Sequence, residues 1–261
     1  MHGNSRPVRS AQRGPHDDLR ARVLTHLASP WRRPIAFHTR AAFEVAAARA
    51  AAHAGPVQLD AGCGNGTSTL QIAANAPQAL VIGVDKSSAR LGGSPPDAAR
   101  ARRGPIDDGL PELRPTNRDH GGNMLLLRAD LRDFWRLALA ADWRPARQVL
   151  LYPNPWPKPA QLARRWHAHP VFPFLVALGG TLELRSNWLA YVEEFAAALE
   201  VCEVPAQIAP LAMHDTAGSI VSPFERKYLA SGQTCWRLCA ELGDAGLPGG
   251  RAALVASMSG L

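Results

Sequence analysis

The stretch Val57-Gln-Leu-Asp-Ala-Gly-Cys-Gly-Asn-Gly66 joins a short apolar run to three glycines at alternate positions. The apolar run predicts a buried parallel strand, and residues 67–75 predict the helix that follows the turn. Gly62, Gly64 and Gly66 allow a sharp turn and the close approach of a ligand, because they carry no Cβ. The free N–H groups of a helix N-terminus beside such a turn favour a nucleotide-like ligand.

The residues around the glycines indicate which nucleotide is bound. The dinucleotide fingerprint G-x-G-x-x-G requires a glycine where this chain has Thr67. Asp60 precedes the first glycine, and its carboxylate would repel a pyrophosphate but attract an ammonium or sulfonium group. The pattern therefore favours S-adenosylmethionine over NAD and disfavours a dehydrogenase. A second apolar strand ends in Asp85, whose carboxylate can accept hydrogen bonds from both ribose hydroxyls.

Length and composition place the chain among ordinary α/β proteins. Its 261 residues are 46% hydrophobic, which suits one domain with extensions or, less well, two small domains. The sequence has no apolar run long enough to span a membrane and no signal-peptide pattern, so we expect a cytoplasmic protein without membrane contact. The four cysteines form no C-x-x-C pair, which predicts reduced thiols and no metal site.

The positive charge is concentrated at the N-terminus. The net charge is +7, and residues 1–40 hold eight arginines against two aspartates. We therefore divide the chain into a basic, partly flexible arm at 1–38 and one folded domain at 39–261. The arm is interpreted either as an RNA-binding segment or as a disordered tail, since a charge run alone does not discriminate between them.

Hydrophobic periodicity predicts the remaining elements of an alternating α/β fold. Residues 92–120 have no period and are interpreted as a loop insertion without an assigned role. A loosely alternating segment at 232–238 is expected to close the sheet as an edge hairpin. The other predicted strands are 79–85, 123–128, 146–152 and 181–185, and the other predicted helices are 39–53, a short one from Ser87, 133–140 and 189–199.

The loop after the fourth predicted strand, Pro153-Asn-Pro-Trp-Pro-Lys158, is the most unusual part of the chain. Its three prolines impose a rigid, non-helical path at the edge of the sheet where substrate and cofactor should meet. Asn154 offers a donor and an acceptor, Trp156 a face for stacking, and Lys158 a phosphate contact. Arg164, Arg165, His167 and His169 follow in an expected helix, as a phosphate-binding face or simply a solvated one.

With these motifs identified, the chain resembles the bacterial tRNA (guanine-N7-)-methyltransferase family from about Val57 to Leu238. The resemblance rests on the glycine stretch, Ile-Gly-Val-Asp85, Arg-Ala-Asp130, Pro-x-Pro-Trp-Pro-Lys158, Gly-Gly-Thr-Leu-Glu-Leu-x-Ser-x-Trp188 and Ser-x-Phe-Glu225. It implies a Rossmann-like class I S-adenosylmethionine-dependent methyltransferase fold with a seven-stranded, mostly parallel sheet. It also implies a tRNA substrate and a monomer or homodimer.

Residue by residue, the resemblance implies two groups of site residues. The expected cofactor-binding residues are Asp60, Gly62, Gly64, Asp85, Asp130 and Asn154. The expected substrate-binding residues are Lys158, Asn187, Ser222 and Glu225. Asn154 is also the expected catalytic residue.

This chain departs from the family pattern at the substrate side. Asn154 and Asn187 stand where the family has aspartates, and Pro159-Ala-Gln161 replaces a Lys-Arg-His stretch. Carboxylates accept the N–H donors of guanine more strongly than amides do. We therefore hypothesise formation of N7-methylguanosine in tRNA and retain two alternatives. The first is a methyltransferase of the same fold with another substrate, and the second is a non-catalytic protein that binds the cofactor and RNA. Glu225 is interpreted as the remaining acid of the pocket or as half of a structural ion pair.

Overall fold

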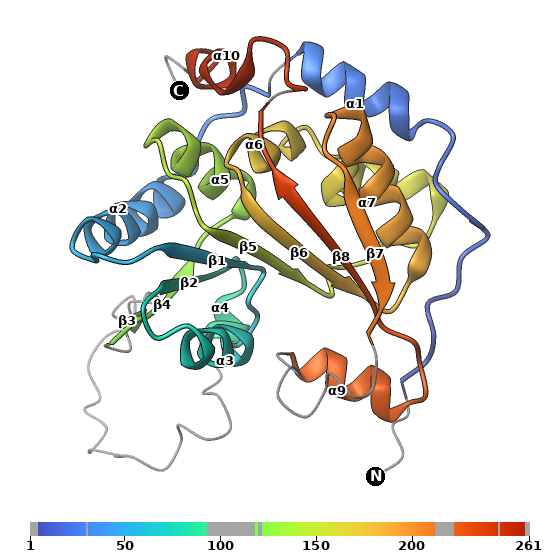
Figure 1. Cartoon of the computed structure of the whole chain (residues 1–261), viewed down its shortest axis with the longest axis horizontal. Coiled ribbons are helices and arrows are strands. Elements are labelled where there is room, and N and C mark those ends of the chain that lie inside the picture. The colour runs from blue at the N-terminus through green and yellow to red at the C-terminus, as the bar shows by residue number, and fades with distance from the viewer. Residues whose placement is uncertain are drawn as a thin grey trace.

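One mixed β-sheet organises the computed structural model, with helices on both sides (Figure 1). The structure describes residues 5–29, 31–92, 118–119, 122–211, 222–244 and 246–258. The two-residue β3 adds to the seven strands expected. Across the sheet the strands are β3 (Arg118–Asp119), β4 (Met124–Arg128), β2 (Leu80–Asp85), β1 (Val57–Ala61), β5 (Arg147–Leu151), β6 (Gly180–Ser186), β8 (Trp236–Leu242) and β7 (Ala206–Pro210).

The parallel strands bring the predicted site residues to one edge of the sheet. β4, β2, β1, β5 and β6 run in the same direction, so their carboxyl ends lie together. The chain passes from β1 outward to β2 and β4 and then returns to β5 on the other side of β1. The strand order therefore reverses between β1 and β5, and open α/β sheets bind their ligands at such a switch point.

The central strands are buried on both faces, as their continuous apolar sequences predict. In β2, Leu80, Ile82 and Val84 face the larger apolar core, whereas Val81 faces a smaller core with Ile72. The larger core includes side chains of α1 (Leu19–Ala28), α2 (Phe37–Ala51), α5 (Leu131–Ala140), α6 (Phe172–Ala177), α7 (Leu189–Val201) and α10 (Gly250–Ala256). The smaller core includes side chains of α3 (Thr67–Asn75) and α4 (Ser88–Gly92).

Apart from the segment after Lys158 and the one at 232–238, the predicted strands and helices of the body are confirmed, with ends that differ by no more than two residues. The helix at Thr67–Asn75 begins and ends where the sequence predicts. Most of the expected insertion, 93–117, lies outside the residues that the structure describes.

The N-terminal segment is the largest correction. The sequence predicts flexibility up to about residue 29, whereas α1 occupies Leu19–Ala28 and packs on α7. Leu19, Val23 and Leu27 recur every four residues and are buried in the larger core. Because arginines and aspartates surround these three apolar residues, the composition of the segment alone does not indicate a helix with a buried face. The prediction of a flexible segment is therefore wrong for α1, which belongs to the folded body.

Two other expectations differ from the structure. The segment expected as an edge hairpin forms β8, which lies between β6 and β7 and is antiparallel to both. Leu238 of β8 is buried in this internal position. The helix expected after Lys158 consists instead of two 3₁₀ turns, η1 (Pro159–Arg164) and η2 (Trp166–Ala168).

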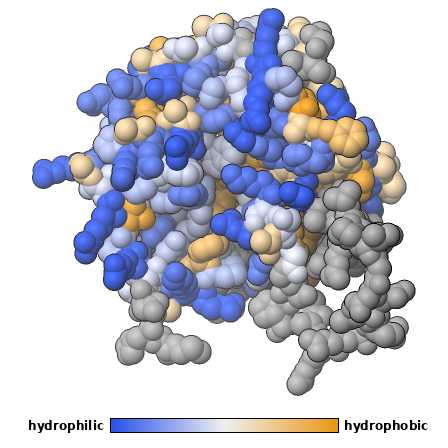
Figure 2. All heavy atoms as spheres, turned by 180° about the vertical axis from the view of Figure 1, so that it is seen from behind, coloured by the Kyte–Doolittle hydropathy of each residue, from blue (hydrophilic) through white to orange (hydrophobic). Residues whose placement is uncertain are grey.

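The surface is predominantly hydrophilic on the face opposite to that of Figure 1. Figure 2 shows apolar side chains there in small separate areas between charged and polar ones. A large contiguous apolar patch would instead indicate a protein or membrane contact. Among the described helices, none combines the length and apolar character needed to cross a membrane. The described residues also contain no cluster of histidine, cysteine and acidic side chains suited to a metal ion.

Candidate active site

The glycine turn after β1 is built by its backbone and by the acid at the end of β2. Gly62, Gly64 and Gly66 have φ angles of 85°, 60° and 84°, in the left-handed region that disfavours other residues. The Asp85 carboxylate accepts hydrogen bonds from the N–H of Gly64 at 3.0 Å and of Ser87 at 2.8 Å. Asp85 therefore holds the turn in place in addition to any contact with a ligand.

The space around these glycines separates a packing role from a ligand-facing one. A Cβ at Gly66 would lie 2.5 Å from the Leu126 side chain, so close packing of α3 on the sheet favours glycine here in addition to its positive φ. A Cβ at Gly62 or Gly64 would meet no atom within 4 Å. The first two glycines therefore border open space at the switch point, where a ligand can approach the backbone.

Asp60 is buried beneath this turn and is bound by two hydroxyl groups. Ser68 and Thr69, in the first turn of α3, donate to its Oδ2 at 2.6 and 2.7 Å. Burial, reinforced by the charge of Asp85, raises the pKa of Asp60 to about 6 despite these two hydrogen bonds. A cationic group placed nearby would favour the ionised carboxylate, because opposite charges stabilise each other strongly at such a site.

Asp130, at the carboxyl end of β4, is used as a helix cap. Its Oδ1 accepts the N–H of Arg132 at 3.0 Å, and its carboxylate forms an ion pair with the Arg132 guanidinium. Burial opposes ionisation of Asp130, but the hydrogen bonds and charge of Arg132 outweigh it and lower its pKa. Arg128, the last residue of β4, pairs with Asp85 in register, and Asp130 follows two residues later, so both acids lie at the carboxyl edge of the sheet.

The loop after β5 is strained as well as rich in proline. Tyr152 and Trp156 have φ angles of 49° and 46°, which are unfavourable for side chains of this size. Such outliers occur where the surroundings over-determine the backbone, often at functional sites. Asn154 and Lys158 are exposed on this loop, and the Arg164 guanidinium lies 4.8 Å from the centre of the Trp156 ring.

Glu225 is held inside an ion-pair cluster and is not open to solvent. It lies in the first turn of α9 (Pro223–Ala230) and is 1% exposed. Its Oε1 and Oε2 accept from Arg185 Nη1 at 3.0 and 2.9 Å, and Tyr152 Oη donates to Oε2 at 2.9 Å. Arg185 also pairs with Glu183. The structural ion pair is therefore the arrangement that Glu225 adopts.

Ser222 and Asn187 complete the predicted residues at this edge. Ser222 is the N-cap of α9 and accepts the N–H of Phe224 at 3.2 Å, so its hydroxyl stabilises the helix. The Asn187 side chain, at the end of β6, donates to Gln233 Oε1 at 2.8 Å. The structure thus brings Asp60, Asp85 and Asp130 to one side of the switch point and the loop after β5, Asn187 and α9 to the other.

Several residues that shape this region are absent from the predicted site or were predicted in another role. Tyr152 and Arg185 hold Glu225, and Arg165 holds the loop backbone with two hydrogen bonds to Trp156 O. Arg165 and His167, expected on a phosphate-binding or solvated face, are both fully buried, which corrects that expectation. The sequence contains one indication of this burial: Glu194 lies on the apolar side of α7, and a buried acid requires a buried partner.

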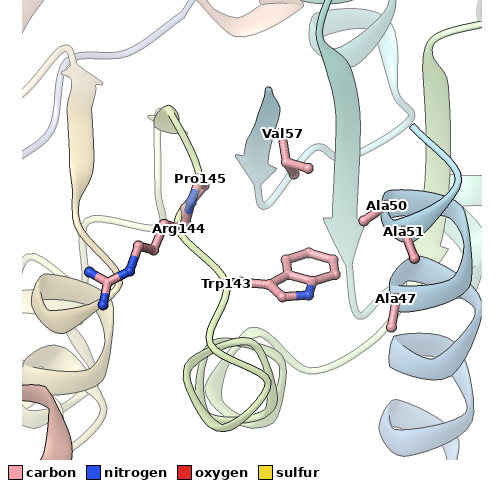
Figure 3. Close-up of a pocket in the computed structure, with 7 residues that line it drawn as sticks. All are labelled: Ala47, Ala50, Ala51, Val57, Trp143, Arg144 and Pro145. Carbon is pink, nitrogen blue, oxygen red and sulfur yellow. The ribbon is translucent and has the colours of Figure 1, made fainter. Parts of the chain in front are cut away.

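A separate pocket lies at the opposite edge of the sheet. The Trp143 indole points toward the alanines of α2, and Val57 at the start of β1 lies above it in the view (Figure 3). Its lining is Ala47, Ala50, Ala51, Val57, Trp143, Arg144 and Pro145. None of these residues belongs to the glycine turn or to the loop after β5, so this pocket is distinct from the candidate active site.

Comparison with known sequences identifies relatives of this chain. Residues 54–238 match the family described as putative methyltransferase. A tRNA (guanine-N(7)-)-methyltransferase of Anaeromyxobacter dehalogenans (strain 2CP-C) is 30% identical over 192 residues, 70% of this chain and 84% of that protein. A protein of the same name from Mycobacterium avium (strain 104) is 33% identical over 150 residues, 54% of this chain but only 48% of the relative. The chain therefore spans about half of this second relative.

Comparison with solved structures confirms the predicted fold class. The 16S rRNA methyltransferase KamB matches with a TM-score of 0.51 and 16% identity, over 81% of this chain and 95% of KamB. An antibiotic-related methyltransferase matches with a TM-score of 0.50 and 14% identity, over 75% of this chain and 92% of that chain. At these identities the likeness concerns the fold alone.

Proposed function

The chain belongs to the putative methyltransferase family, and on that premise we propose that it methylates N7 of a guanosine in tRNA with S-adenosylmethionine. One observation carries the proposal: an open glycine turn flanked by Asp60 and Asp85 lies across the switch point from a strained, exposed loop. The relatives named tRNA (guanine-N(7)-)-methyltransferase support the choice of substrate. A cytoplasmic location and a monomeric or homodimeric state belong to the same proposal.

The cofactor side of the edge has the chemistry that S-adenosylmethionine needs. Gly62 and Gly64 leave room for its methionine part, and the neighbouring Asp60 favours a cationic group. Asp85 uses two hydrogen bonds for backbone amides, and its two oxygens can accept further bonds from ribose hydroxyls. Asp130 would border the adenine, with its carboxylate already committed to Arg132. When bound, the cofactor supplies a methyl group activated by a positively charged sulfur.

The loop after β5 is proposed to hold the nucleotide. Lys158 is exposed and suited to a phosphate, and Trp156 offers a ring for stacking beside Arg164. Asn154 and Asn187 would contact the base by neutral hydrogen bonds. Ser222 and Glu225 would act through α9, because their polar atoms stabilise that helix and its contact with β6.

Methyl transfer to N7 of guanine places few chemical demands on these residues. The N7 atom already carries a lone pair, so no general base has to remove a proton before attack. The protein contributes by aligning the base with the methyl group and by excluding water. Asn154, the proposed catalytic residue, contributes through orientation, and its neutral side chain is compatible with that task.

A second candidate function is methylation of a different RNA base, and the state of Glu225 favours it. Guanine presents the N1–H and N2–H donors, which carboxylates accept best. Asn154 and Asn187 are neutral, and Arg185 and Tyr152 occupy both oxygens of Glu225. A non-catalytic protein that binds the cofactor and RNA is the remaining alternative.

One labelling experiment distinguishes these functions. The full-length protein is incubated with methyl-labelled S-adenosylmethionine and unmodified bulk tRNA, and the labelled nucleosides are identified after digestion. Label in 7-methylguanosine is the expected result. Label in another nucleoside would replace guanosine N7 as the target, and no label despite measured cofactor binding would favour the non-catalytic alternative. The Asp85→Ala variant is the negative control.

A further inference from the structure

Three ionisable side chains lie buried together behind the loop after β5. Arg165 and His167, from the two 3₁₀ turns, and Glu194, from α7, each have an exposed fraction of 0%. Arg165 Nη1 and His167 Nε2 both contact Glu194 Oε2, the latter at 2.9 Å. Burying separated charges costs several kcal/mol, so such groups persist only when they are paired.

The chemistry of the cluster identifies Glu194 as its centre. Burial lowers the pKa of His167, and its Nδ1 is buried without a hydrogen-bond partner among the described residues. A neutral ring that donates from Nε2 to Glu194 fits both facts, because a protonated ring would leave a buried N–H unpaired. Burial opposes ionisation of Glu194, but its bonds to His167 and Arg165 outweigh burial and lower its pKa to about 2. Glu194 is therefore the charged partner of Arg165 at neutral pH.

Arg165 connects Glu194 to the loop after β5. Its Nε and Nη2 donate to Trp156 O at 3.2 and 3.0 Å. Trp156 is one of the two strained positions of the loop. The same guanidinium lies 5.0 Å from the ring centre of Trp188, the residue after Asn187. Arg165 thus touches the segments that follow β5 and β6, which both contribute to the proposed nucleotide site.

The N-terminal segment 5–16 closes the other side of the cluster. Gln12 Nε2 and the N–H of His16 donate to Glu194 Oε1 at 2.5 and 3.0 Å, and Gln12 Oε1 accepts from Arg165 Nη1 at 3.0 Å. Ser10 Oγ donates to Pro157 O, inside the loop, at 2.6 Å. Segment 5–16 is therefore bound to the loop directly and through Glu194.

We propose that Glu194 is a positioning residue for methyl transfer, which fixes the Pro153–Lys158 loop through Arg165 and the N-terminal segment 5–16. The cluster is fully buried and touches no solvent, so it acts through the loop and not on the nucleotide. Loss of the Glu194 charge would release Arg165, and the strained Trp156 backbone would relax. Asn154 and Lys158 would then lose their fixed placement. The expected effect of Glu194 on methyl transfer rests on the proposed function, whereas its effect on the conformation of the loop does not.

The test compares Glu194→Gln with Glu200→Gln, an exposed acid on the same helix. For Glu194→Gln we expect S-adenosylmethionine affinity within twofold of wild type, at least a tenfold fall in kcat with the labelled nucleoside as readout, and a smaller change in KM for tRNA. Gln12→Ala removes one ligand of the cluster from a half-buried position and should give a smaller change in the same direction. The Glu200→Gln control should match wild type.

Hydrogen exchange supplies a readout that does not depend on the substrate. Amide exchange in peptides covering residues 154–168 should be at least tenfold faster in Glu194→Gln and Gln12→Ala, whereas exchange in β2 should not change. Failure of wild type to modify tRNA would refute the proposed function and leave this comparison intact. Unchanged exchange and unchanged kcat in folded Glu194→Gln would overturn the positioning role. If that variant does not fold, unchanged exchange in Gln12→Ala overturns it instead.

Discussion

The Asp85 carboxylate accepts the backbone N–H of Gly64 across a sequence distance of 21 residues, at 3.0 Å. This hydrogen bond connects the end of β2 to the turn after β1. Asp85 is expected to contact the cofactor, and it also fixes the backbone of the glycine turn on which the cofactor is proposed to lie. Because Asp85 has both roles, its substitution should lower the affinity for S-adenosylmethionine by more than the loss of one ribose contact would.

Asp85→Ala should abolish measurable binding of S-adenosylmethionine by calorimetry. The substitution removes the ribose acceptor and leaves two backbone amides, Gly64 N and Ser87 N, without their partner. A hydrogen bond to a charged group contributes about 1.5–3 kcal/mol, so the loss of several such bonds should weaken cofactor binding by more than about tenfold. Glu200→Ala is the exposed control. Undiminished affinity in a folded Asp85→Ala protein would remove the cofactor assignment.

Cofactor binding should release a proton near pH 6. The pKa of Asp60 is raised to about 6 in the free protein, and a bound cation would lower it again. Affinity should therefore rise with pH through about 6 and level off above 7, because the cation prefers the ionised carboxylate. Calorimetry at pH 6 in buffers of different ionisation enthalpy measures this release. Asp60→Asn should lack it, and equal enthalpies for wild type in all buffers would contradict the prediction.

Asn154→Asp should raise the rate of 7-methylguanosine formation if the loop contacts guanine. A carboxylate accepts N–H donors about twice as strongly as a neutral amide. Initial rates with unmodified tRNA at subsaturating concentration measure the gain. Lys158→Ala, with a lost phosphate contact, should raise KM in the same assay. No gain from Asn154→Asp would favour methylation of a different base.

Glu225→Gln should lower the free energy of unfolding by about 3 kcal/mol, because it leaves the buried Arg185 short of one counter-charge. Urea denaturation gives the value. Glu241→Gln, an exposed acid in β8, should change it by less than about 0.5 kcal/mol. Equal stabilities of wild type and Glu225→Gln would mean that Glu183 alone neutralises Arg185.

The arginines of segment 5–16 should contribute to RNA affinity. Arg6, Arg9 and Arg13 are exposed, so they can be changed without loss of buried contacts. Deletion of residues 1–30 would remove the buried helix α1, which makes substitution the better test. Replacing all three by glutamine should weaken tRNA binding at low salt. It should also reduce the salt slope of log K by up to about 2–3, because each of the three phosphate contacts contributes about 0.7–0.9. An unchanged slope would leave these arginines without this role.

The local pattern of the chain was sufficient for most of the fold. The strand–glycine–helix transition at Val57–Asn75 and the apolar runs that end in Asp85 and Asp130 carry their own conformational signals, because strand burial, positive φ and capping depend on neighbouring residues. The same runs indicate which acids lie at the carboxyl edge. The same reasoning does not predict α1, because a ten-residue helix with three buried apolar residues among arginines gives only a weak period.

The partners of the buried charges were decided only by the tertiary structure. Glu225 is joined to Arg185 across 40 residues and Glu194 to Gln12 across 182, and no local period encodes such pairs. The position of β8 inside the sheet likewise depends on its pairing with two distant strands. A sequence states which residues can bear charge or bury surface, but long-range packing selects the partner, because only the folded chain removes these groups from water.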